Sequence, residues 1–304
     1  GDCKDRAYLV ATLARKYGLH VDMATISTHP TPGFSGTGIN QYNHVICSFE
    51  KDGKHIFFDP TDRYSAFGSL PESDIEGMAL VLNAGKPQII AVPPPNMQPS
   101  MDIHITGDLE NPKGAAARLI FRNSYYSRAQ YAQQELTGID RNNYLEKSVN
   151  AILQKIAIHN PEFESETDST VIYKAEADIS GFIITTDSKK YIMQNAFMVA
   201  DADVLNREKD TLGLYLTGRL NASLMIDLKT RGYSGESAQA SFGEGNPVKF
   251  SAIAMPNAEG VQLRYNLSQS EKFLKGEKKA NYLAFCKGYF RNKKNMFILT
   301  KREK

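Results

Sequence analysis

The sequence predicts an α+β protein in which a helix packed on an antiparallel sheet is followed by a β-sandwich-like domain with a helical insertion. Three observations predict this fold class. Residues 2–17 have apolar side chains at helical spacing, an Asp-Gly pair at residues 52–53 lies between two alternating segments, and a proline-rich stretch at residues 92–100 divides the chain. A chain of 304 residues is long enough for about two domains, so we expect one over residues 1–91 and another over residues 101–304.

Residues 2–17 are predicted to form a helix that Gly18 ends, because apolar side chains recur every three or four positions. Asp2 is a good N-cap residue, and Asp5 can complete a capping box. Cys3 therefore lies in the first helical turn. The free N–H groups and the dipole of that turn favour a thiolate whereas the two aspartates oppose it, so the sequence alone does not decide between thiol and thiolate.

A strand-like segment at residues 21–27 and two more at residues 43–50 and 55–60 follow the helix. The last two flank Asp52 and Gly53, and an Asp-Gly pair between alternating segments is a strong signal for a two-residue hairpin turn. This turn fixes the strand register. It pairs residue 51 with residue 54, residue 49 with residue 56, and residue 46 with residue 59.

The register brings two polar residues of different strands together. Because side chains alternate between faces, His44 and Asp59 share one face as diagonal neighbours, with backbones about 7–8 Å apart. We expect the helix that carries Cys3 to pack on that face. The same register sends Cys47 to the opposite face with Phe58, which makes Cys47 a poor candidate nucleophile.

Cys3, His44 and Asp59 occur in the order of a thiol triad. A thiolate attacks a carbonyl carbon, an imidazole carries the proton, and a carboxylate fixes the tautomer of the imidazole and stabilises its charge. The three residues are therefore the candidate catalytic site of this chain.

The motifs Gly-Asp-Cys-Lys-Asp at residues 1–5, Asn-His at residues 43–44 and Asp-Pro-Thr at residues 59–61 resemble those of bacterial transglutaminase-like proteins. That superfamily has the papain-like core of transglutaminases and related cysteine peptidases, and the resemblance is to extracytoplasmic members, common in Bacteroidetes, in which β-rich domains flank the core. It covers about the first ninety residues. It implies Cys3 as nucleophile, His44 as general base and acid, and Asp59 as the orienting carboxylate.

The resemblance also implies an activity and a location. The expected enzyme acts on amide bonds of a peptide or protein through an acyl-thioenzyme intermediate, with hydrolysis favoured over crosslinking. The expected location is periplasmic or secreted, with an envelope protein as a possible partner. Relatives have helices before the nucleophile that supply one cleft wall and an oxyanion donor, whereas this sequence starts two residues before Cys3. Three interpretations remain open: the chain is a fragment of a longer protein, another chain supplies the missing cleft wall, or the protein is a non-catalytic scaffold. The isolated chain is expected to have weak or no enzyme activity.

Each site residue also has a structural alternative. Cys3 could be a small buried helix residue, His44 a hydrogen-bonded strand histidine, and Asp59 the start of a simple turn. Other residues are interpreted as structural: His20, His29 and His55 as surface residues, and Cys47 and Cys286 as core thiols.

The region after the proline-rich linker is predicted to be mostly strands. Two helices are expected at residues 125–136 and 142–158, and a third at residues 279–290. Strands are expected at residues 101–107, 115–122, 170–179, 191–199, 222–229, 248–254, 261–267 and 295–300. No catalytic constellation is recognised there, and the aromatic cluster of the helix pair, which comprises Tyr125, Tyr126, Tyr131 and Tyr144, is interpreted as packing.

Composition excludes several functional classes. The chain has 36 basic and 34 acidic residues, which argues against a nucleic-acid-binding surface. Its three cysteines show neither the spacing of a disulfide scaffold nor, with the histidines, that of a zinc site, so no metal or cofactor is expected. No apolar run approaches the length of about 18 residues that a membrane span requires.

Limited proteolysis is expected to cut within residues 92–100 and to leave a stable C-terminal fragment, because a proline-rich linker joins two separately patterned regions. Mass spectrometry would identify the cut, and urea denaturation would test the released fragment. A fragment without a cooperative unfolding transition would contradict the two-domain interpretation.

Overall fold

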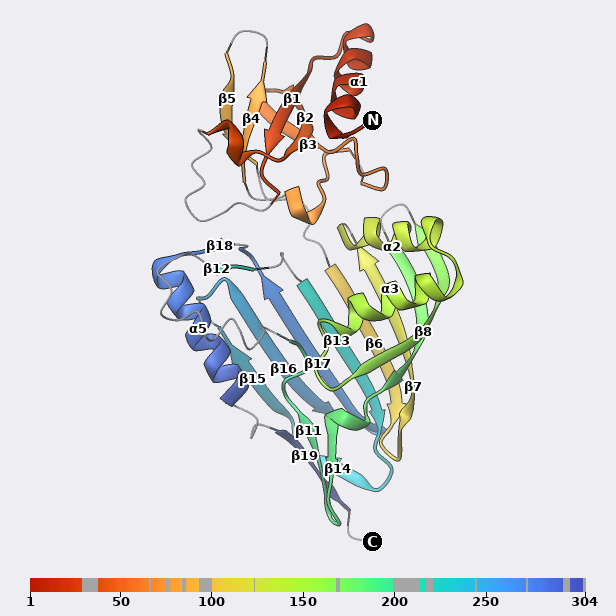
Figure 1. The fold of residues 1–304 in the computed structure, drawn as a ribbon. Coiled ribbons are helices and arrows are strands. Elements are labelled where there is room, and N and C mark those ends of the chain that lie inside the picture. Colours follow the sequence, from red (N-terminus) through yellow and green to blue (C-terminus); the bar gives the residue numbers. More distant parts are fainter. Residues whose placement is uncertain are drawn as a thin grey trace. The chain divides into compact units, whose positions relative to one another are not determined.

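The computed structural model describes residues 1–28, 38–65, 67–74, 77–83, 86–92, 100–122, 124–167, 170–198, 214–216, 221–243, 245–271, 273–291 and 296–302. Its backbone contacts divide the chain into two compact units (Figure 1). The first unit comprises Gly1–Pro99 with Asn123–Arg128, and the second comprises Ser100–Arg122 with Ala129–Lys304. Residues 93–99 of the linker predicted at residues 92–100 lie outside the described residues.

The first unit is a helix on a five-stranded antiparallel sheet whose strands are in the order β3-β2-β1-β4-β5 (Figure 1). Its elements are α1 (Cys3–Lys16), β1 (Val21–Ile26), η1 (Ile39–Gln41), β2 (His44–Lys51), β3 (Lys54–Phe58), η2 (Glu72–Asp74), β4 (Met78–Leu82) and β5 (Gln88–Ala91). The helix and the first three strands confirm the elements predicted for this region. The strands β4 and β5 were not predicted.

The hairpin turn and its register are confirmed. Asp52 and Gly53 both have positive φ, at 53° and 72°, as a two-residue turn of this type requires. Gly adopts such a φ without a steric cost, and Asp tolerates it better than most residues. The ladder pairs Lys51 with Lys54 and continues to Cys47 opposite Phe58.

The start of α1 is fixed by the predicted capping box. The Asp2 side chain accepts hydrogen bonds from the N–H groups of Lys4 and Asp5, at 2.9 and 3.3 Å, and the Asp5 side chain accepts one from the Asp2 N–H at 3.0 Å. Cys3 is therefore the first helical residue, as expected.

The two faces of the five-stranded sheet have separate cores. One core contains Ile26, Ile46 and Phe57. The other contains Ala7 and Ala11 of α1 with Val21, Val45 and Cys47 of the sheet. The helix thus covers the Cys47 face, and the expectation that it packs on the face of His44 is wrong. The apolar pattern of the sequence could not decide which face α1 covers, because both faces of β2 carry apolar residues.

The second unit is dominated by a mixed eight-stranded sheet in the order β15-β16-β17-β13-β6-β7-β9-β8, in which β6 and β13 are parallel. Its elements are β6 (Ser100–Asp108), β7 (Asn111–Arg122), α2 (Ser124–Glu135), α3 (Gly138–Asn150), β8 (Ala157–Thr167), β9 (Thr170–Asp178), η3 (Ser180–Phe182), β10 (Ile183–Thr185), β11 (Lys189–Met193), β12 (Leu214–Tyr215), β13 (Asn221–Lys229), β14 (Tyr233–Gly235), β15 (Ala238–Phe242), β16 (Val248–Pro256), β17 (Gly260–Gln269), β18 (Phe273–Leu274), α5 (Gly276–Arg291) and β19 (Met296–Lys301). The first residues of α2, up to Arg128, group with the first unit.

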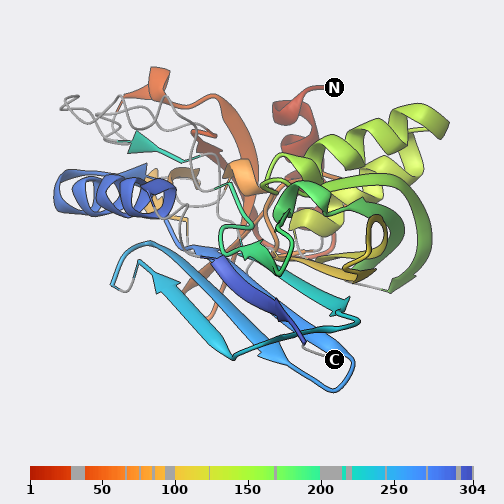
Figure 2. The ribbon, with the colours of Figure 1, turned by 90° about the horizontal axis from the view of Figure 1, so that it is seen from below.

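One face of the eight-stranded sheet is apolar and covered (Figures 1 and 2). The helix α2 contacts it where the Tyr173 hydroxyl donates to the Ala129 carbonyl at 3.3 Å. The helix α5 contacts it through Tyr289, whose ring lies 5.0 Å from that of Phe250. A four-stranded sheet, β10-β11-β19-β14, covers another part, since the Tyr265 hydroxyl of β17 donates to the Met193 carbonyl of β11 at 3.0 Å. The expected two-sheet arrangement is thus only part of the cover, and helices form the rest.

One predicted helix of the second unit is too long. The helix α3 ends at Asn150, and residues 157–158, which were assigned to it, begin the edge strand β8. The Asn150 side chain explains the change, because its amide donates to the Ile158 carbonyl at 3.0 Å and its oxygen accepts from the Ile158 N–H at 2.8 Å. This side chain bonds to the backbone of the following segment. The spacing of apolar residues carries no information about such a bond, so it could not predict where the helix ends.

Replacing Ala7 with Leu is expected to destabilise the protein by about 1–3 kcal/mol, because Ala7 is fully buried between α1 and the sheet and a larger side chain overpacks that core. Urea denaturation would measure the loss. Tyr8→Leu is the matched control, since Tyr8 is 64% exposed on the same helix and its replacement should change stability by less than about 0.5 kcal/mol. Equal effects of the two substitutions would contradict the described packing of α1.

Candidate active site

The structure places the three predicted site residues at the ends of different elements of the first unit. Cys3 is the first residue of α1, His44 is the first residue of β2, and Asp59 directly follows β3. Cys3 is partly buried, and Asp59 is almost wholly buried. All three lie where a strand or helix begins or ends, so their side chains can meet although α1 and the predicted face of His44 are on opposite sides of the sheet.

His44 and Asp59 form a short, nearly buried pair. The Nε2 atom of His44 lies 3.0 Å from Oδ2 of Asp59, and the two side chains are 17% and 4% exposed. The hydrogen bond with Asp59 raises the pKa of His44 to about 9, although burial alone would lower it. Burial would raise the pKa of Asp59, but hydrogen bonds from His44 and Thr61 outweigh burial and hold it below its usual range. An ionised Asp59 accepts, so Nε2 carries the proton.

The Asp59 carboxylate also organises its own loop. Its Oδ1 atom accepts from the Thr61 N–H at 2.8 Å, and the Thr61 hydroxyl lies 2.7 Å from both carboxylate oxygens. The Arg6 guanidinium of α1 donates to the Thr61 carbonyl at 3.3 Å. From the sequence, Asp59 could either form a turn or orient the imidazole. In the structure its carboxylate does both, because it accepts hydrogen bonds from Thr61 and from His44. The Arg6 contact ties the Cys3 helix to the Asp59 loop.

Cys3 acts on the same imidazole. It is among the groups that raise the pKa of His44, with a smaller effect than Asp59 and Asp74. Because Nε2 is engaged by Asp59, the ring nitrogen left for the thiol is Nδ1. The structure therefore pairs the imidazole with a carboxylate through Nε2 and leaves Nδ1 available to a thiol.

Asn43 anchors the position of His44. Its side-chain oxygen accepts from the Thr28 N–H at 2.9 Å, and its amide donates to the Thr28 hydroxyl at 3.0 Å. These bonds join the start of β2 to the chain just after β1, where Ile26 pairs with His44. Asn43 of the Asn-His motif therefore has a structural role, because its hydrogen bonds fix the end of the strand that carries the imidazole.

Asp74 is a site residue that sequence reasoning missed. It ends η2, its side chain is 2% exposed, and its Oδ2 atom lies 3.7 Å from Nε2 of His44. Burial raises the pKa of Asp74 to about 6. The family resemblance covers about the first ninety residues and so includes Asp74, but none of the motifs that carry it pointed to this acid.

The site also groups metal-ligand types of atom. Among the described residues, His44, Asp59 and Asp74 form the one set of three ligand side chains whose atoms lie within 4.8 Å of one another. Within this set, Nε2 of His44 and Oδ2 of Asp59 are hydrogen bonded at 3.0 Å. The expectation that no metal is used stays a prediction.

The remaining cysteines are unsuited to nucleophilic attack. Burial, with the Asp59 charge, raises the pKa of Cys47 to about 12, and its Sγ atom lies 3.7 Å from the Ala7 carbonyl under α1. Burial raises the pKa of Cys286 in α5 to about 11. Both are core thiols, as predicted. His55 is bonded to Ser48 at 2.8 Å, and His29 lies outside the described residues.

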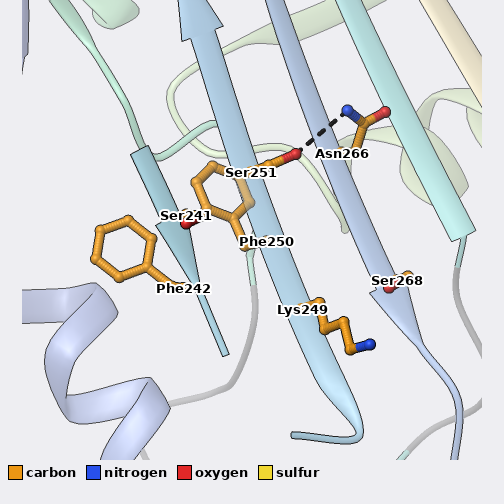
Figure 3. A pocket seen from close by; sticks show the side chains of 7 residues that line it. All are labelled: Ser241, Phe242, Lys249, Phe250, Ser251, Asn266 and Ser268. Atoms are coloured by element: carbon orange, nitrogen blue, oxygen red, sulfur yellow. Dashed lines mark hydrogen bonds between the residues drawn. The ribbon is translucent and has the colours of Figure 1, made fainter. Parts of the chain in front are cut away.

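A hollow of about 370 Å³ in the second unit has no comparable chemistry (Figure 3). It lies on β15, β16 and β17, where the Asn266 amide donates to the Ser251 hydroxyl at 3.3 Å. Its described lining contains Ser, Phe, Asn and Lys side chains and no Cys, His, Asp or Glu. Its described lining therefore lacks the thiol, imidazole and carboxylate groups that are found in the first unit.

No protein-family model matches this chain, and no curated protein matches it. A crystal structure from Parabacteroides distasonis, described as a "putative protease", is similar in structure, with a TM-score of 0.42 and 9% sequence identity. The match covers 97% of this chain and 43% of that chain, so this chain spans less than half the length of the similar protein. Among the described residues, no helix is long and apolar enough to cross a membrane. The assignment of the site rests on the contacts described above.

The stability of the folded chain is expected to fall as the pH rises through about 9. The pKa of His44 is raised from 6.5 to about 9, so its stabilising contribution is fully present below about pH 6.5 and is lost as the ring deprotonates in the folded state. Urea denaturation at several pH values would compare the wild type with His44→Gln. The free energy of unfolding of the wild type should fall relative to the variant between those pH values, and parallel curves would contradict the His44–Asp59 pair.

Proposed function

We propose that this chain carries the catalytic site of a transglutaminase-like cysteine enzyme that acts on amide bonds through an acyl-thioenzyme intermediate. In this proposal Cys3 is the nucleophile, His44 is the general base and acid, and Asp59 orients the imidazole. Peptide hydrolysis is favoured over acyl transfer to an amine, because water is always available as the second nucleophile. The substrate class is a peptide or protein amide.

One observation carries the proposal. His44 hydrogen bonds to Asp59 at 3.0 Å through Nε2, and Cys3 is among the groups that raise the pKa of the same ring. The hydrogen bond to the carboxylate fixes the tautomer of the imidazole. It leaves Nδ1 free to exchange a proton with a thiol. A buried structural histidine needs one partner, whereas this one has a carboxylate partner and a thiol that acts on the same ring.

The first half of the reaction forms the thioester. The Cys3 proton moves to His44, and the thiolate attacks the amide carbonyl carbon, forming a C–S bond. The imidazolium then donates that proton to the amine nitrogen as the C–N bond breaks. Asp59, held ionised by His44 and Thr61, stabilises the positive charge on the ring during this step.

The helix start supplies one donor for the oxyanion. The Asp2 carboxylate accepts from the N–H groups of Lys4 and Asp5 and does not take that of Cys3. The Cys3 N–H is one of the first-turn groups that lack an intrahelical partner, and it is attached to the nucleophilic residue. A single donor of this kind is typically worth about 10²- to 10³-fold in rate.

The second half of the reaction releases the acyl group. Water gives a proton to His44 and attacks the thioester, the C–S bond breaks, and the proton returns to Cys3. An amine in place of water would complete a transfer reaction. The proposed location is periplasmic or secreted, with an envelope protein as a possible partner, and both follow only from the family resemblance.

The proposal predicts that iodoacetamide alkylates Cys3 faster than Cys47 or Cys286 at neutral pH, because Cys3 is partly exposed beside an imidazole and the others are buried. Peptide mass spectrometry would give the three rates. Replacing His44 with Ala should slow Cys3 alkylation several-fold, and Asp59→Asn should have a smaller effect. The assay measures nucleophile activation and requires no known substrate.

His55→Ala is the matched control, because His55 is a histidine of β3 that hydrogen bonds to Ser48 of β2 and not to a thiol. It should leave Cys3 alkylation unchanged. If wild type and His44→Ala are alkylated equally fast, no Cys–His pair operates. The alternative function is then favoured, a non-catalytic binding or scaffolding module that retains a degenerate form of the fold.

A further inference from the structure

Asp74 is the most unusual polar residue of the first unit. It lies at the end of η2 and is 3% exposed. Its Oδ1 atom accepts a hydrogen bond from the Ser73 hydroxyl at 2.7 Å. Its Oδ2 atom is buried and has no hydrogen-bond donor among the described residues. Polar atoms buried in this way are normally satisfied, so the orphan oxygen requires an explanation.

The surroundings of Asp74 supply that explanation. Among the described residues, the titratable groups that act on Asp74 are His44 at the start of β2 and Asp59 after β3, and Ser73 of its own element donates a hydrogen bond to it. Nε2 of His44 is 3.7 Å from Oδ2 of Asp74 and 3.0 Å from Oδ2 of Asp59. One imidazole nitrogen therefore faces two carboxyl groups.

The two carboxyl groups also face each other. One oxygen of each lies within 4.8 Å of the other, and the charge of Asp59 is among the causes that raise the pKa of Asp74. Two carboxyl groups can share a hydrogen bond only if one of them carries a proton. Asp59 is held ionised by His44 and Thr61, so Asp74 is the one that takes the proton. Protonated, Asp74 has an O–H that satisfies the orphan oxygen.

We propose that Asp74 is a second positioning residue for His44. When Asp74 is protonated, it donates a hydrogen bond to Asp59. When Asp74 is ionised, it stabilises the charge of the imidazolium together with Asp59. The charge on His44 is then set by two carboxyl groups. The consequence for Cys3 rests on the proposed function, whereas the effect on His44 does not.

The two states differ in their effect on the thiol. Burial raises the pKa of Asp74 to about 6, so its proton is lost to solvent near that pH. Below about pH 6, Asp74 is neutral and its hydrogen bond to Asp59 weakens the effect of the Asp59 charge on the His44 ring. Above it, a second negative charge lies beside His44, favours the imidazolium, and increases the thiolate fraction of Cys3. The proposed enzyme would therefore become more reactive as the pH rises through about 6.

The test is the titration of the His44 ring by NMR in wild type and Asp74→Asn. Asn keeps the shape and can donate to Asp59, but it carries no charge. The pKa of His44 should fall by roughly one, which is the low end of the effect of an opposite charge within about 4–6 Å. Asp59→Asn should lower it further. Asp62→Asn is the matched control, since Asp62 bonds to Tyr64 and Ser65 in the same loop region, and it should leave His44 unchanged.

A second measurement follows Asp74 directly in the wild type, so the test does not depend on a variant that folds. Carboxyl NMR should show Asp74 titrating near pH 6, and the rate of Cys3 alkylation should rise through the same pH in wild type but not in Asp74→Asn. A His44 pKa that is unchanged in folded Asp74→Asn, or an Asp74 that titrates near its ordinary value, would overturn the proposal. So would curves that change on addition of EDTA, because a bound cation would then satisfy Asp74.

The outcomes separate the two proposals. If Asp74→Asn shifts the His44 titration while His44→Ala leaves Cys3 alkylation unchanged, the role of Asp74 stands and the proposed function fails. If His44→Ala slows alkylation while Asp74→Asn shifts neither titration nor alkylation, the proposed function stands and Asp74 is only a packing residue.

Discussion

The buried Asp59 carboxylate holds together three segments that are separate in the chain. It binds His44 at the start of β2, it fixes its own loop through Thr61, and through the Thr61 carbonyl that loop is joined to Arg6 of α1. A buried carboxylate is stable only when its oxygens are fully hydrogen bonded. The requirement to satisfy one charge therefore brings the helix start and the two strand ends to one place.

This organisation keeps the imidazole and the carboxylate of the site outside the apolar cores of the first unit. The cores on the two faces of the sheet do not include His44 or Asp59, whereas the partly buried Cys3 packs against the core beneath α1. The polar residues lie at element ends, where backbone groups are left without regular partners and side chains can satisfy them. A site built at such ends can place Cys3, His44 and Asp59 from different elements without interrupting the ladder of the sheet.

The second unit has a different organisation. Its eight-stranded sheet buries one face beneath α2, α3, α5 and a smaller sheet, and buried tyrosines contribute much of the contact. The Tyr289 hydroxyl donates to the Phe197 carbonyl at 2.7 Å and accepts from its N–H at 3.2 Å, which ties α5 to an irregular segment. Such residues have an apolar ring for the core and a polar group for the backbone. Nothing in the described hollow of this unit resembles the thiol and imidazole of the first.

The sequence by itself determined the local geometry of the site. The capping box at Asp2 and the turn at Asp52 and Gly53 depend on a few adjacent residues, and they set the position of Cys3 and the register that brings His44 near Asp59. Only the tertiary structure decided which face of the sheet α1 covers, where α3 gives way to β8, and that Asp74 lies beside His44. These depend on contacts between residues far apart in the chain. Such contacts are selected by burial and by satisfaction of polar groups, and periodicity and turn chemistry do not record them.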